Sequence, residues 1–349
     1  MRTTAGVTVG ATLTAVALYA SRDRLGDAFR NLGHVRLLWL SVALVTELVS
    51  MGAFARMQRR LLAAGGLLLS VPAALAVTYA GNAVAMTLPV AGSATGTRFT
   101  FKRWVQRGAE PAVAAWGLLM AGIFSTSALA IIAGIGGVVA GNVATGIVGA
   151  AITLLGIAPF VVVIVALRRP RWRRALITMS TPAVARVLAL RGHTAATARA
   201  AIEQFFDRVA AVRIGGRTGV GVAAFALLNW VADIACLAAC LAAFGATVPW
   251  TRLVLLYLAG IAAATFTLTP AGIGVVEVAV AATATSFGIG KTDAMASALL
   301  YRGISSWLVI AAGWVIFAVL RRTPTPVADA SGPTEMALEP IPIPTVSTR

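Results

Sequence analysis

Four ionisable side chains lie inside stretches of the sequence that are otherwise apolar. Glu47, Asp233 and Glu277 are acidic, and Arg302 is basic. A charge at the middle of a membrane costs roughly 2.5–3.5 kcal/mol on insertion scales, so such groups normally pair and face the interior of a helix bundle. We therefore predict an ion pair between Glu277 and Arg302, with Asp233 as a competing partner. The pair is a structural bridge between helices, or it has a functional role in a polar pathway or in a proton-coupled switch.

Glu277 follows a segment that breaks one of the apolar stretches. The sequence TLTPAGIGVVE, residues 267–277, contains Pro270, Gly272 and Gly274. Proline removes a backbone donor from a helix, and glycine readily adopts non-helical conformations. We therefore expect the helix to stop here and to restart just before Glu277.

A second break occurs in the first half of the chain, where LPVAGSATG covers residues 88–96 and includes Pro89 and Gly92. Backbone outside a helix is tolerated at membrane depth only where protein or a water-filled cavity satisfies it. Paired discontinuous segments in the two halves of a chain point to a substrate site in transporters. The other interpretation is that both breaks are ordinary kinks. Asn82 before the first break and Asn229 could each bond freed backbone or a ligand.

These residues belong to a chain of 349 residues that is 59% hydrophobic and 12% charged. Apolar runs of about 17–25 residues are long enough to cross a bilayer. The sequence therefore predicts an all-α polytopic membrane protein with about eight hydrophobic segments. These segments cover residues 3–20, 37–55, 68–91, 111–140, 144–167, 217–243, 251–288 and 294–320.

The net charge of +17 is concentrated at the ends of the apolar segments. This is the distribution of cytoplasmic loops in membrane proteins, and it argues against a nucleic-acid partner. The basic clusters, which we place in the cytoplasm, are residues 56–60, 98–107 (including Arg98), 168–174 and 321–322. Both termini are then cytoplasmic, and the two broken segments are entered from opposite faces, as in an inverted repeat. The arginines of residues 21–36 fit this scheme badly.

Residues 1–322 are expected to form one transmembrane domain with a cytoplasmic basic loop at 168–216. Residues 323–349 are rich in Pro and Thr and are expected to be a disordered cytoplasmic tail. Two cysteines and two isolated histidines form no pattern typical of a metal site. The chain has no phosphate-binding loop of the Walker type. We expect no cofactor, no metal and no catalytic residue.

Several motifs together resemble the lysylphosphatidylglycerol synthase/flippase transmembrane family. They are TLTPAGIGVVEVAVAATATSFGIG, ASALLYRGISSWL and, in the first half, YAGNAVAMTLPVAGSATGTRFTFKRW. The positions that match the family pattern in the second half are Pro270, Gly272, Gly274, Val275, Glu277, Gly288, Tyr301 and Arg302. The resemblance covers residues 3 to 322 approximately, and it adds Tyr301 to the candidate pathway residues.

The resemblance implies a bundle with two re-entrant elements that moves a lipid between the leaflets of the plasma membrane. In the best-known relatives the cargo is an aminoacylated phosphatidylglycerol, and a cytosolic aminoacyl-transferase domain follows the membrane part. We expect that domain to be absent here, so that the chain does not make the lipid. Its partners would be anionic or aminoacylated phospholipids or polyprenyl-linked lipids, with a separate synthase or glycosyltransferase. The alternative is an accessory or scaffold protein in envelope lipid or glycolipid synthesis.

The topology is testable by cysteine labelling of intact cells. A cysteine introduced at Thr247 should react with a membrane-impermeant thiol reagent added outside, and a cysteine introduced at Trp172 should not. The reverse pattern would contradict the orientation and the inverted relation of the two breaks.

Overall fold

The computed structural model describes residues 35–88, 92–139, 215–265 and 269–322, together with isolated positions between 140 and 214. All regular secondary structure in these ranges is helical, which confirms the all-α prediction. The first half contains α3 (Leu37–Ala64), α4 (Val71–Thr87), α5 (Gly92–Gln106) and α6 (Pro111–Val139). The second half contains α10 (Gly216–Ala243), α11 (Trp250–Thr265), η2 (Pro270–Gly272), α12 (Val275–Ser286), α13 (Lys291–Arg302), η3 (Gly303–Leu308) and α14 (Val309–Arg322).

Four of the described helical stretches are long and apolar enough to cross a membrane. They are Leu37–Ala64, Pro111–Gly137, Gly216–Ala243 and Lys291–Arg322. Many large apolar side chains on these helices point outward, among them Leu48 and Val315, which are 64% and 66% exposed. A soluble protein rarely exposes so much contiguous apolar surface, whereas lipid-facing helices require it.

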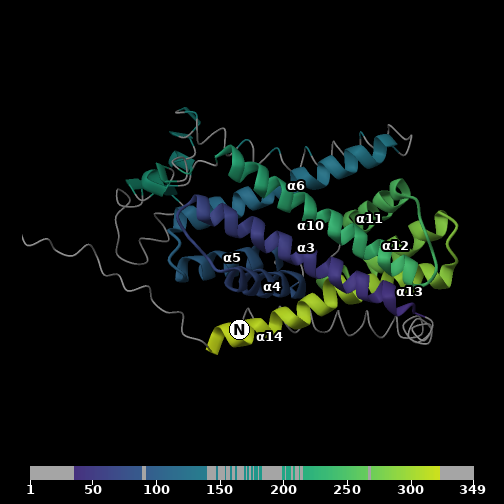
Figure 1. Ribbon diagram of the computed structural model, residues 1–349. Helices are drawn as coiled ribbons and strands as arrows, with labels where there is room; N and C mark the ends of the chain where they lie inside the picture. The colour runs from purple at the N-terminus through teal and green to yellow at the C-terminus, as the bar shows by residue number, and fades with distance from the viewer. Residues whose placement is uncertain are drawn as a thin grey trace, which may run out of the picture.

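The two long helices α3 and α10 pack side by side and form the middle of the bundle (Figure 1). The pair α4 and α5 lies towards the end of the bundle at which α3 and α14 finish (Figure 1). The pair α11 and α12 lies towards the opposite end (Figure 1). The two short helix pairs therefore occupy opposite ends of the bundle, as the inverted arrangement predicts. That either pair is re-entrant in a membrane stays a prediction.

One helix extends beyond the span predicted for it. The second apolar span was expected to end near residue 55, at the basic cluster, but α3 continues to Ala64. Arginine is a good helix former, so a basic cluster can mark the polar edge of a membrane without ending the helix. The helix ends instead at Gly65 and Gly66, and Gly66 has a φ of 93°.

The last span also differs from a simple helix. It is helical from Lys291 to Arg322, but residues Gly303–Leu308 form a π-helical turn directly after Arg302. Such turns inside α-helices are rare and frequently lie at functional sites. The apolar pattern of the sequence gave no indication of this turn.

Several predicted elements lie outside the described residues. They are the first span 3–20, residues 21–34 of the segment 21–36, Pro89 and the tail 323–349. The segments 144–167 and 195–214 are described only at isolated positions.

The last helix, α14, approaches α4 closely because Gly313 has no side chain. A Cβ atom at this position would lie 2.3 Å from the carbonyl oxygen of Tyr79 and 2.6 Å from the Cβ of Ala83. Small residues at helix interfaces allow this kind of close packing in membranes, where van der Waals contact replaces the hydrophobic effect. Gly313 thus fixes the distance between the last helix and the first short helix pair.

The substitution Gly313→Ala should lower the melting temperature of the purified protein in detergent, because the backbone of α4 cannot move aside without opening the interface. Gly134→Ala on α6 is the matched control, since a Cβ there meets nothing within 4 Å. The control should be neutral or stabilising by about 0.4–1 kcal/mol. Equal melting temperatures for the two variants would contradict the close packing of α4 and α14.

Candidate functional site

The predicted break in the segment 251–288 is present. Helix α11 ends at Thr265 and α12 begins at Val275. Between them Ala271, Gly272 and Gly274 all have positive φ, at 52°, 69° and 88°. The left-handed conformation costs an L-residue such as Ala271 about 1–2 kcal/mol, so its surroundings must hold it there.

Glu277 stabilises the restart of the helix after this break. It is the third residue of α12, and its Oε2 accepts a hydrogen bond from the backbone N–H of Gly274 at 2.6 Å. A carboxylate at this position satisfies a free backbone donor and interacts favourably with the positive end of the helix dipole. Glu277 is only 3% exposed, so the backbone bond forms away from solvent.

Arg302 on α13 connects this restart with the break itself. Its Nε donates to Oε1 of Glu277 at 3.2 Å, which confirms the predicted ion pair. Its two other guanidinium nitrogens donate to the backbone carbonyl of Ala271 and, at 2.5 Å, to the hydroxyl of Ser306 in the π-helical turn. One buried side chain therefore binds the freed backbone, the acid that caps α12 and the irregular turn of the last span.

Asp233 on α10 was predicted to compete with Glu277 for Arg302. It interacts electrostatically with Arg302, but its two carboxylate oxygens accept hydrogen bonds from tyrosines. The hydroxyl of Tyr257 lies 2.6 Å from Oδ2, and that of Tyr301 lies 3.0 Å from Oδ1. Tyr257 was missed by the sequence analysis; its hydroxyl in the otherwise apolar run of α11 is the signal that could have found it.

Glu47 on α3 is 6% exposed and lies close enough to Asp233 to interact electrostatically. Its Oε2 has no hydrogen-bond partner among the described residues. Asn229 on α10 donates to the hydroxyl and the carbonyl of Ser50 on α3, at 2.9 and 3.1 Å. Asn229 therefore joins the two central helices, and Glu47 is a buried acid with an unused oxygen.

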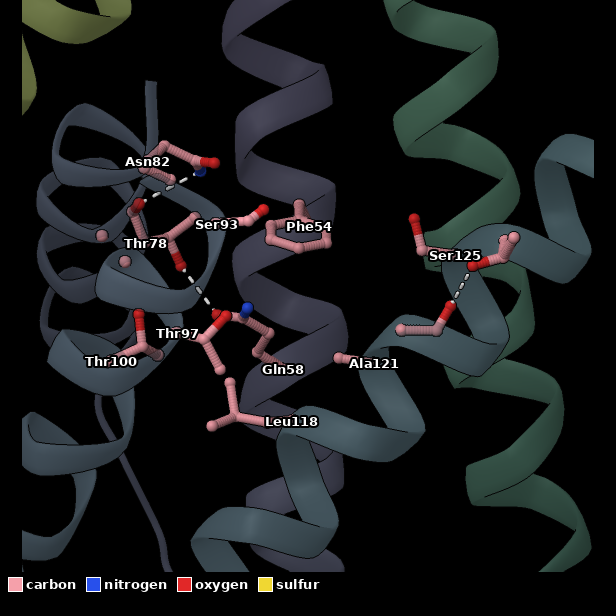
Figure 2. A pocket seen from close by; sticks show the side chains of 15 residues that line it. Phe54, Gln58, Thr78, Asn82, Ser93, Thr97, Thr100, Leu118, Ala121 and Ser125 are labelled. Atoms are coloured by element: carbon pink, nitrogen blue, oxygen red, sulfur yellow. Dashed lines mark hydrogen bonds between the residues drawn. The ribbon is translucent and has the colours of Figure 1, made fainter. Parts of the chain in front are cut away.

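A cavity of about 320 Å³ lies between α3, α4, α5 and α6, in the other half of the chain (Figure 2). Figure 2 shows polar side chains of α4 and α5 on one side, Ser125 of α6 on the other and α3 between them. Two amides, Gln58 and Asn82, face this space. Six hydroxyl-bearing residues also line it: Thr78, Ser93, Thr97, Thr100, Ser125 and Thr126. No charged side chain is among the described residues of the lining.

Part of this lining is already hydrogen-bonded within the protein. The hydroxyl of Thr78 donates to Oε1 of Gln58 at 3.0 Å, and Nδ2 of Asn82 donates to the carbonyl of Thr78 at 3.1 Å (Figure 2). The hydroxyl of Thr126 donates to the carbonyl of Gly122. In the part of the chain that the structure describes, the amide nitrogen of Gln58 and the amide oxygen of Asn82 have no further partner, so both can bond a molecule in the cavity.

The wall formed by α4 and α5 depends on glycines at the first break. Helix α4 ends at Thr87, Leu88 is extended, and Gly92 is the first residue of α5. A Cβ on Gly92 would lie 2.0 Å from the carbonyl oxygen of Ala85, and one on Gly96 would lie 2.6 Å from the Cβ of Ala85. Gly92, predicted as a helix-break residue, therefore serves the close packing of the two helices. Pro89 lies outside the described residues.

Arg98 is exposed on α5 and lines neither the cavity nor the network around Arg302. The neighbouring face of α5 forms a second, basic hollow of about 330 Å³ with α14. Arg103 lies over the ring of Phe99, and Arg321 lies over the ring of Phe317; the two rings are 5.2 Å apart. Lys102 and Gln106 complete its lining.

The structure therefore brings some of the predicted site residues together and separates the others. Glu277, Arg302, Asp233, Tyr301 and Glu47 lie together among α3, α10, α12 and α13. Asn82 lines the neutral cavity of the first half, and Asn229 bridges α3 and α10. That any of them belongs to a substrate pathway stays a prediction.

The variant Glu277→Gln should lower the stability of the folded protein by about 3–5 kcal/mol, because it removes the carboxylate that is ion-paired with the buried guanidinium of Arg302. Thermal unfolding in detergent measures this loss. Glu47→Gln is the control, since it also replaces a buried acid, but one that has an unpaired oxygen and no ion pair among the described residues. Equal losses for the two variants would contradict a specific clamp at Glu277.

The double variant Glu277→Arg with Arg302→Glu should fail to restore stability, although it keeps both charges. An arginine at 277 cannot accept the N–H of Gly274, and a glutamate at 302 cannot donate to the carbonyl of Ala271. Full recovery in the same unfolding measurement would show that the two residues form a simple ion pair.

Comparison with known protein families identifies the family of this chain. No curated protein matches the sequence significantly. The family described as the lysylphosphatidylglycerol synthase TM region matches residues 4–313, which include both helix breaks, the buried network around Arg302 and the neutral cavity. The match confirms the resemblance predicted from the sequence motifs. This chain is a membrane protein that belongs to the lysylphosphatidylglycerol synthase transmembrane family.

Proposed function

We propose that this protein is a lipid translocase that moves a lipid head group across the membrane without a chemical step. The observation that carries the proposal is the cavity between α3, α4, α5 and α6, which presents hydroxyl and amide groups inside an otherwise apolar bundle. Polar groups are costly at membrane depth unless they are bonded or line a wet cavity. A head group crossing the bilayer needs such a lining, while its acyl chains stay in the surrounding lipid.

The network around Arg302 has a different part in this proposal. All three nitrogens of the guanidinium have protein acceptors, and both carboxylate oxygens of Glu277 accept hydrogen bonds. Each nitrogen of the guanidinium and each oxygen of the carboxylate is thus already engaged within the protein, which makes these groups less available to a passing head group. The network therefore supports the proposal indirectly, by holding the broken segment η2 against α4, which forms part of the cavity wall.

The basic hollow between α5 and α14 supports contact with lipid phosphates. Lys102, Arg103 and Arg321 line it, and basic pockets between helices at the cytoplasmic side commonly bind lipid head groups. This hollow would hold an anionic lipid near the cytoplasmic leaflet of the plasma membrane. The same feature favours the alternative function, in which the protein is a scaffold that binds lipid beside a separate synthase or glycosyltransferase and moves nothing.

Transport and scaffolding are separated by a leaflet-sidedness assay. The purified full chain is reconstituted into liposomes with lipids that carry a fluorescent acyl chain, and dithionite then bleaches the lipids of the outer leaflet. If the protein moves lipids between the leaflets, the dithionite also bleaches the lipids that started in the inner leaflet. It does so faster than in protein-free liposomes. Bleaching that stops at the outer leaflet for every head group in a panel of anionic, aminoacylated and glycosylated lipids would contradict the proposal.

Blocking the cavity with a large side chain tests whether lipid head groups pass through it. Thr97→Phe places a ring into the cavity from α5, and Ala94→Phe places the same ring on an exposed position of the same helix that is not part of the lining. The first variant should slow lipid movement strongly and the second should not. Equal rates in the two variants would contradict passage through this cavity.

A further inference from the structure

We propose that the cavity between α3, α4, α5 and α6 binds a neutral, polyhydroxylated head group, that is, a sugar or another polyol. This inference rests on the proposed lipid translocation, because it names the class of head group that the cavity takes. Three properties of the lining support it: its charge, its hydrogen-bonding groups and its opening.

The lining carries no charged side chain among the described residues, which disfavours a strongly charged occupant. The described residues that line the cavity are hydroxyl, amide and apolar residues with glycines, and none of them is ionisable. A charged ammonium or phosphate in such a space has no counter-charge, and burying an unpaired charge is far more costly than burying a bonded polar group. The buried charges of the other half are already engaged: Arg302 pairs with Glu277, and Asp233 accepts from two tyrosines.

The hydrogen-bonding groups match those of a polyol. A sugar hydroxyl both donates and accepts, as do the hydroxyls of Ser93, Thr97 and Thr100 on successive turns of α5. Gln58 adds a free amide donor and Asn82 a free amide acceptor. An occupant with several hydroxyl groups bonds all of these at once, whereas a carboxylate or phosphate has acceptors alone and leaves the protein's acceptors unmatched.

The size and opening of the cavity suit a head group that remains attached to a lipid. Its volume of about 320 Å³ is at the lower end of the range of ligand pockets, roughly 300–1,000 Å³. Ser93 and Thr97 line it and are also exposed, so that the cavity opens beside α5 rather than being enclosed. A head group can therefore enter sideways while its acyl chains stay outside the bundle.

The test is lipid binding by the purified full chain, measured by native mass spectrometry in a neutral detergent. Three lipids with the same acyl chains are compared: glucosyl-diacylglycerol, phosphatidylglycerol and lysylphosphatidylglycerol. The basic hollow of α5 and α14 can also retain an anionic lipid, so the measured quantity is the change in retention that a cavity variant causes for each lipid. The double variant Ser93→Ala/Thr97→Val should weaken retention of the glucosyl lipid about tenfold, because it loses two modest hydrogen bonds. Its retention of the other two lipids should change little.

The control is Thr283→Val/Ser286→Ala on α12. It removes the same two kinds of hydroxyl, but these bond carbonyls of their own helix, at 2.8 and 2.7 Å, away from the cavity. It should bind the glucosyl lipid like the wild type, and both double variants should unfold at the same temperature as the wild type. Retention of a charged lipid that falls as much as that of the glucosyl lipid in the cavity variant, or equal binding of the glucosyl lipid by the two double variants, would overturn the inference.

The same preparations distinguish failure of the inference from failure of the proposed function. If the glucosyl lipid binds as expected but no lipid changes leaflet in liposomes, the cavity is a binding site for a polyol and the translocase proposal fails. If all three lipids move and the cavity variant moves and binds them like the wild type, the translocase proposal stands and the assignment of a neutral head group is wrong.

Discussion

Backbone groups that leave a helix inside a membrane find no water to bond, so a protein group must satisfy them. In this protein that constraint acts at the break between α11 and α12, where Ala271 adopts a left-handed conformation. Arg302 donates to the carbonyl of Ala271, and Glu277 accepts from Gly274 on the other side of the turn. The carboxylate inside an apolar segment is therefore needed because the segment is broken: it caps the restarted helix and neutralises the arginine that binds the freed backbone.

The two halves of the chain accommodate polar groups within apolar helices in different ways. The second half uses charged groups that bond one another, including the tyrosine-bound Asp233. The first half adds a cavity lined by uncharged hydroxyl and amide groups, although its helix α3 also carries the buried Glu47. A network whose groups bond one another is suited to holding a shape, and a partly bonded neutral lining is suited to binding. The proposed function accordingly gives the structural part to the network around Arg302 and the binding part to the neutral cavity.

Much of the charged half could be predicted from the sequence. Glu277 and Arg302 are ionisable groups in apolar segments of a membrane protein, and such groups are so costly when unpaired in a membrane that pairing follows from energetics alone. The partner of Asp233 could not be predicted in this way, because a tyrosine hydroxyl gives no charge signal. The end of α3 could not be predicted from charge either, because a basic cluster can mark the edge of a membrane without ending a helix.

Almost nothing in the sequence indicated the cavity. Serine and threonine in apolar helices commonly bond a carbonyl of their own helix, as Thr126 does with Gly122 and Thr283 with Ala279, and they then present no free polar group. Only the packing of α4 against α5 shows which hydroxyls face a common space. Asn82 was identified as a candidate because it precedes the break, whereas Gln58, its neighbour across the cavity, lies in a cluster that looked like a loop boundary.

The central claim is that the head group passes through the first half and not through the charged network. Photo-cross-linking tests it most directly. The reconstituted protein is irradiated with a lipid that carries a photoreactive group on its head, and the modified peptides are identified by mass spectrometry. Labels within residues 93–100 of α5 and 118–126 of α6 are the predicted result. Labels confined to residues 271–277 and 302–306 would contradict the account, because the head group would then contact the charged network.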